Sequence, residues 1–143
     1  MQELTGYYLE DLHVGMTAAF AKTVSEADIY GFAGITGDTN PVHINEEYAR
    51  QTPFEGRIAH GMLSAGFIST VLGTKLPGPG AIYMMQTLKF KAPVRIGDTV
   101  TARATIKEIV EGKPRVKIET VCTVGDTVVA EGEALIMVPQ RNP

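Results

Sequence analysis

Hydrophobic and polar residues alternate with a period of two over four stretches in the second half of the chain. This pattern predicts β-strands at residues 81–90, 99–110, 115–124 and 127–138, separated by glycine-containing turns. Only Gly125-Asp126 separates the last two stretches, which predicts an antiparallel hairpin. One earlier strand is predicted at residues 16–24.

The first half of the chain has the pattern of helices. Ser25 and Asp28 have the spacing of a capping box and predict a helix that ends near residues 34–37. Asn45 can cap a short helix over residues 46–51. A longer helix is predicted from residues 60–61 to about residue 76, because no proline interrupts that stretch before Pro77.

The long predicted helix carries a stripe of small residues. They recur at spacings of three and four, at Ala65, Gly66, Ser69 and Gly73. Glycine weakens a helix, so the stripe suggests that a sheet wraps tightly around this face. A buried helix followed by an antiparallel meander predicts one α+β domain over residues 1–143.

Composition excludes several classes of function. The chain is 44% hydrophobic and 20% charged, with a net charge of −3, so neither nucleic acid nor a membrane surface is an expected partner. No apolar run has the length of a membrane span, and residues 1–5 show no secretory signal. Cys122 is the only cysteine, which favours a cytoplasmic location and a role as a small core residue.

No cofactor or metal is expected from the motifs. The three histidines, His13, His43 and His60, lack metal-ligand spacing, and no cysteine cluster supports them. No glycine-rich phosphate loop is present. His60 is expected to have a structural role.

The strongest chemical signal is the segment from Asp38 to His43. Pro41 disfavours helix at Asn40, so the carboxylate and the imidazole are predicted on a short rigid turn that directs both toward one point. Asn40 would support the turn through bonds to the backbone. Taken singly, Asp38 fits an ordinary turn residue and His43 a packed histidine; together they can activate a water.

A second candidate is the start of the long helix. The free N–H of Gly61 there could stabilise an oxyanion, although on the residues alone a plain helix start is the better explanation. Ser69 follows two turns later and could reach the same pocket or serve packing. No G-x-S-x-G elbow surrounds it, so a nucleophilic serine is not expected.

Together these motifs resemble the MaoC-like, or hydratase 2, family, whose best-known members are R-specific enoyl-CoA hydratases. The resemblance rests on residues 32–43 (FAGITGDTNPVH), with Ala49 spaced as in the family signature, and on residues 58–63 (IAHGML). It continues through residues 76–78, 90–94, 97–98 and 132–134.

The resemblance implies a hot-dog fold, in which an antiparallel sheet wraps a central helix and an overhanging helical segment carries the site. It implies catalytic roles for Asp38 and His43, an oxyanion role for Gly61, supporting roles for Asn40 and Ser69, and an acyl pocket that includes Leu72 and Leu135. It also implies a homodimer that acts without a cofactor, with a CoA thioester as substrate.

Several activities remain open at this level. An acyl-CoA substrate would suit fatty-acid oxidation or the supply of polyhydroxyalkanoate precursors, whereas an acyl carrier protein would suit a (3R)-hydroxyacyl dehydratase. A hot-dog acyl-CoA thioesterase would direct water at the carbonyl carbon instead. A non-catalytic acyl-thioester-binding subunit is the remaining alternative, and retention of both Asp38 and His43 argues against it.

Overall fold

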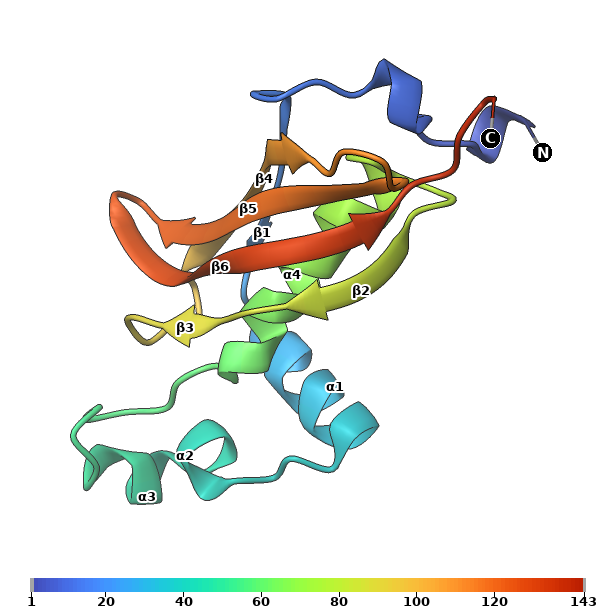
Figure 1. The fold of residues 1–143 in the computed structure, drawn as a ribbon. Coiled ribbons are helices and arrows are strands. Elements are labelled where there is room, and N and C mark those ends of the chain that lie inside the picture. The colour runs from blue at the N-terminus through green and yellow to red at the C-terminus, as the bar shows by residue number, and fades with distance from the viewer. Residues whose placement is uncertain (1, 143) are drawn as a thin grey trace.

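The computed structural model describes residues 2–142, which form an antiparallel sheet curved around one long helix (Figure 1). The strands are β1 (Thr17–Thr23), β2 (Ile82–Gln86), β3 (Lys89–Phe90), β4 (Thr99–Ile109), β5 (Arg115–Val124) and β6 (Thr127–Met137). Their order is β1-β4-β5-β6-β2, with β3 also paired to β6. The central helix is α4 (Gly61–Thr74).

Three shorter helices lie beyond one end of the sheet, close to the start of α4 (Figure 1). They are α1 (Glu26–Thr36), α2 (Pro41–Ile44) and α3 (Glu46–Arg50), and two 3-10 turns, Gln2–Leu4 and Leu9–Asp11, precede β1. The α+β class, the hot-dog arrangement and the overhanging helical segment expected from the sequence are therefore confirmed. Among the described residues, no helix combines the length and apolar character that a membrane crossing requires.

The capping signals act where the sequence places them. Ser25 and Asp28 form a reciprocal capping box at the start of α1, and Gly37 ends that helix with φ 81°. Asn45 caps α3 by accepting from the N–H of Tyr48. Each predicted element is found within a few residues of its expected ends, except for the strand predicted over residues 81–90.

Alternation along the long strands supplies one wall of the core. Val100, Ala102, Ala104 and Ile106 of β4 are buried at every second position, and β5 repeats the pattern. Cys122 belongs to this layer, where burial raises the pKa of its thiol to about 11. Its predicted role as a small core residue is confirmed.

The small-residue stripe of α4 does not face the sheet, so that prediction is wrong. The helix buries Phe67, Ile68 and Val71 instead, at the spacing of one helical face. Gly66 and Gly73 are exposed, and a Cβ built on either would meet no atom of residues 2–142 within 4 Å. A period of three to four marks the exposed face of a helix as well as the buried one, and large apolar residues take the buried face because they gain most from burial.

The single strand predicted over residues 81–90 is also wrong, because it divides into β2 and β3. Between them the carbonyl of Thr87 lies against Gly132 of β6, where an added Cβ would be 1.7 Å from that oxygen. The Thr87 N–H donates to the Glu133 carbonyl at 2.9 Å. The chain therefore approaches β6 too closely at Thr87 for one regular strand to continue from β2 into β3.

This close approach of Thr87 to Gly132 gives a stability prediction. Gly132→Ala places a methyl group against backbone atoms that cannot move independently, and we expect a loss of about 1–3 kcal/mol in unfolding free energy, measured by urea denaturation. Gly31→Ala, on an open face of α1, is the control and should stabilise by about 0.5–1 kcal/mol. Equal effects of the two substitutions on the unfolding free energy would contradict the close approach of Thr87 to Gly132.

Candidate functional site

The segment that carries Asp38 and His43 is shaped by two local caps. Gly37 turns the chain out of α1, and the Asn40 side chain accepts from the N–H of Val42 at 3.2 Å, with Pro41 as the first residue of α2. Asn40 thus supports the turn through a backbone bond, as expected. His43 itself lies on the single turn of α2 rather than on an irregular turn, because proline at the first helical position favours a helix after it.

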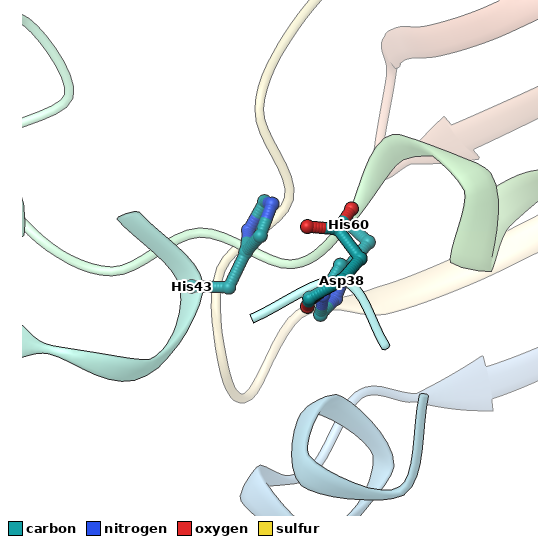
Figure 2. Close-up of side chains that lie close together, drawn as sticks. All are labelled: Asp38, His43 and His60. Atoms are coloured by element: carbon teal, nitrogen blue, oxygen red, sulfur yellow. Dashed lines mark hydrogen bonds between the residues drawn. The ribbon is translucent and has the colours of Figure 1, made fainter. Parts of the chain in front are cut away.

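The structure brings Asp38 and His43 together and adds His60 to them (Figure 2). Each of the three offers one nitrogen or carboxylate oxygen, and these atoms lie within 4.8 Å of one another. His43 is 8% exposed and His60 only 2%, whereas Asp38 is open to solvent. The site thus pairs a buried imidazole with an accessible carboxylate.

Hydrogen bonding fixes the tautomer of His43. Its Nδ1 lies 2.8 Å from the carbonyl oxygen of Ile58, which can only accept, so Nδ1 carries the proton and Nε2 is the acceptor of the neutral ring. Burial lowers the pKa of His43 below its ordinary 6.5, an effect that the Ile58 bond partly offsets. The ring is therefore neutral at pH 7 and can accept a proton at Nε2.

The same three side chains raise the question of a metal ion. The rings of His43 and His60 are stacked, with centroids 3.8 Å apart and planes 27° from parallel. Since imidazole lone pairs lie in the ring plane, stacked rings do not direct them at one point, whereas a metal site needs convergent ligands. The geometry suits a shared water between Asp38 and His43 better than a metal ion.

Gly61 is the first residue of α4, so its N–H has no intrahelical partner and lies at the positive end of the helix dipole. It borders a cavity of about 380 Å³ whose lining is mainly apolar and includes Phe54, Met62 and Phe90. A Cβ at position 61 would lie 2.8 Å from the Phe90 ring, so glycine is what allows this close approach. The cavity can receive an apolar group beside a backbone donor.

The cavity adjoins the histidine site through the segment before α4. Ile58 and Ala59 line it, and the Ile58 carbonyl is the group that holds His43. A ligand in the cavity would therefore lie beside Gly61 and beside the segment that holds His43, although neither Asp38 nor His43 lines the cavity itself.

The other three expected residues lie elsewhere. Ser69 is exposed on the face of α4 that points away from the sheet, and Leu72 is packed in the core at 2% exposure. Leu135 pairs with Met85 and lies on the sheet face opposite to the buried Ala134 and Ile136. None of the three lines the described cavity, and their roles stay predictions.

Arg57 also supports the site, a role that the sequence did not predict. Its Nε donates to the backbone carbonyl of His43 at 2.7 Å, and its Nη1 forms an ion pair with Glu26 of α1 at 2.6 Å. The bond to Arg57 lowers the pKa of Glu26. Arg57 thus ties α2 to α1, and only its proximity to the IAHGML motif hinted at this.

Comparison with known proteins identifies a matching family model and similar proteins of known activity. The family model described as MaoC like domain matches residues 13–131. The chain is 63% identical to the (R)-specific enoyl-CoA hydratase of Rhodospirillum rubrum over 140 residues, which cover 98% of this chain and 97% of that protein. It is 52% identical to the 3-hydroxybutyryl-CoA dehydratase of Methylorubrum extorquens over 142 residues, covering 99% and 90%.

A solved structure agrees with these sequence relatives. The (R)-hydratase from A. caviae involved in PHA biosynthesis aligns with a TM-score of 0.88 and 40% identity, covering 91% of this chain and 99% of that one. The fold, the motif segments and the family match point the same way, and the chain belongs to the MaoC-like family.

Proposed function

We propose that this protein is an R-specific enoyl-CoA hydratase, which adds water reversibly to trans-2-enoyl-CoA and forms (R)-3-hydroxyacyl-CoA. The observation that carries the proposal is the neutral His43, with Nε2 as acceptor, next to Asp38 and to the backbone donor at Gly61. The relatives from R. rubrum and M. extorquens are named for this reaction and for its reverse, which supports the proposal.

In the proposed reaction the thioester carbonyl accepts a hydrogen bond from the Gly61 N–H, which draws electrons from the double bond and makes the β-carbon electrophilic. Asp38 and His43 hold a water, and its oxygen bonds to the β-carbon as one proton passes to the pair. The proton is then delivered to the α-carbon on the same face. The double bond becomes a single bond, and the elements of water are the only atoms added.

No cofactor enters this scheme, because the thioester itself supplies the electron sink. Hydration and dehydration use the same groups in opposite order, so the site serves either direction. A thioesterase would need the water directed at the carbonyl carbon next to Gly61, whereas a water on Asp38 and His43 is held by a separate segment of the chain.

Asp38→Asn should remove nearly all hydration, because the amide cannot take a proton from water. We expect kcat to fall by about 10²–10⁴-fold, followed as loss of the conjugated enoyl-thioester absorbance. The melting temperature should stay unchanged, since Asp38 is exposed and asparagine keeps the oxygen that accepts from the Asn40 N–H.

Asp126→Asn, in the β5–β6 turn, is the matched control and should retain full activity. Because no metal ion takes part in the proposed reaction, the hydration rates with and without EDTA should be equal. Wild-type-like activity of Asp38→Asn, or release of free CoA in place of hydration, would contradict the proposed function.

The pH dependence follows from the lowered pKa of His43. Because the pKa is lowered, the rate should fall to half its maximum only at a pH below 6.5, as Nε2 becomes protonated. Folding stability should decrease over the same acidic range, because the unfolded chain binds a proton that buried His43 resists. A rate that declines already above pH 7 would contradict a role for neutral His43 in the pair.

We also propose that two copies associate through strand β2. This edge strand exposes a row of large apolar side chains, Ile82 at 57%, Tyr83 at 41%, Met84 at 40% and Met85 at 52%. An exposed apolar edge with free backbone groups readily pairs with another strand, and a second copy presents the same edge.

Ile82→Lys should therefore convert a dimer into a monomer, measured by sedimentation velocity at micromolar concentration. Ile35→Lys is the control: Ile35 is 89% exposed on α1, far along the chain from the edge, and its substitution should leave the mass unchanged. A monomeric wild type would refute the association.

A further inference from the structure

His60 is an almost completely buried polar residue whose side chain does not do what its position suggests. It stands at the N-cap of α4, yet its side chain makes no capping bond. Its Nε2 lies instead 2.9 Å from the backbone carbonyl oxygen of Asp38, twenty-two residues earlier in the chain. The side chain therefore links the start of α4 to the segment that carries the carboxylate.

The contact fixes the tautomer of His60. A carbonyl oxygen only accepts, so Nε2 carries the proton and Nδ1 is left as an acceptor. Nδ1 is buried and has no hydrogen-bond partner among the residues that the structure describes. A phenylalanine would fill the same space without a buried unpaired atom, so packing alone does not account for a histidine here.

The His60 ring is in contact with two other rings. The Phe32 ring of α1 is tilted by 44° against it with centroids 4.6 Å apart, and the His43 ring stacks on it at 3.8 Å. The plane of the His43 ring is thus set by His60, while its rotation is set by the Ile58 bond. Together these two contacts hold Nε2 of His43 in one direction.

We propose that His60 is a positioning residue, which holds Asp38 by its carbonyl and His43 by its ring in register with the Gly61 N–H. His60 and Gly61 are adjacent in the chain, so a side chain that holds Asp38 and His43 also fixes their position relative to the Gly61 N–H. The proposal rests on the hydratase function above and adds a group that touches neither water nor thioester in it.

The test separates the donor from the ring. His60→Gln keeps an amide N–H at the reach of Nε2 but loses the ring, whereas His60→Phe keeps the stacking ring but loses the donor. If the carbonyl bond positions Asp38, kcat of His60→Phe on a short trans-2-enoyl-CoA should fall about 10–100-fold with little change in KM. His60→Gln should recover part of that loss, and the part that remains measures the contribution of the ring stacked on His43.

His13→Gln, at an exposed histidine, is the control and should match the wild type. Wild-type kcat in His60→Phe, or equal losses in the Phe and Gln variants, would overturn the proposed role of the donor.

A second measurement needs neither substrate nor a folded variant. Imidazole ¹⁵N spectra of the wild type at neutral pH should show His60 with its proton on Nε2, slow to exchange with solvent. A proton on Nδ1 would overturn the proposal. If the wild type itself fails to hydrate enoyl-CoA, the proposed function fails, and the tautomer still decides whether His60 holds the Asp38 carbonyl.

Discussion

The site depends on the packing of α4 into the concave side of the sheet. Phe67, Ile68 and Val71 anchor the helix in the core and so fix where its first turn emerges. Burial of such side chains is worth about 1.5–3 kcal/mol each, which is enough to make the helix a rigid reference. The Gly61 N–H is held rigidly because Gly61 is the first residue of this helix.

The other half of the site is held differently. Residues 38–41 are exposed, and three bonds between side chains and main-chain oxygens help to secure the segment with Asp38 and His43: His60 to the Asp38 carbonyl, Arg57 to the His43 carbonyl, and His43 to the Ile58 carbonyl. Each donor is a side chain and each acceptor a main-chain oxygen. The geometry of the pair is thus set by directional bonds, while the geometry of the helix is set by burial.

Local signals in the sequence predicted the elements and the Asp38–His43 pairing, because caps, turns and alternation act over a few residues. The contacts of His60 and Arg57 span fourteen residues or more, and no local pattern encodes them. The interruption between β2 and β3 depends on the approach of Thr87 to Gly132, which is also long-range. The small residues of α4 lie largely on its outer face, and a period of three to four alone does not distinguish the outer face of a helix from its inner face.

The burial of Cys122 has a practical consequence. The only thiol of the chain lies in the core with its pKa raised to about 11, so the native protein presents almost no thiolate to alkylating or disulfide reagents. Colour from a thiol reagent in an assay mixture then reports free CoA and not the enzyme. The same reagent, added without substrate, becomes a probe of unfolding, since only an opened β5 would expose the sulfur.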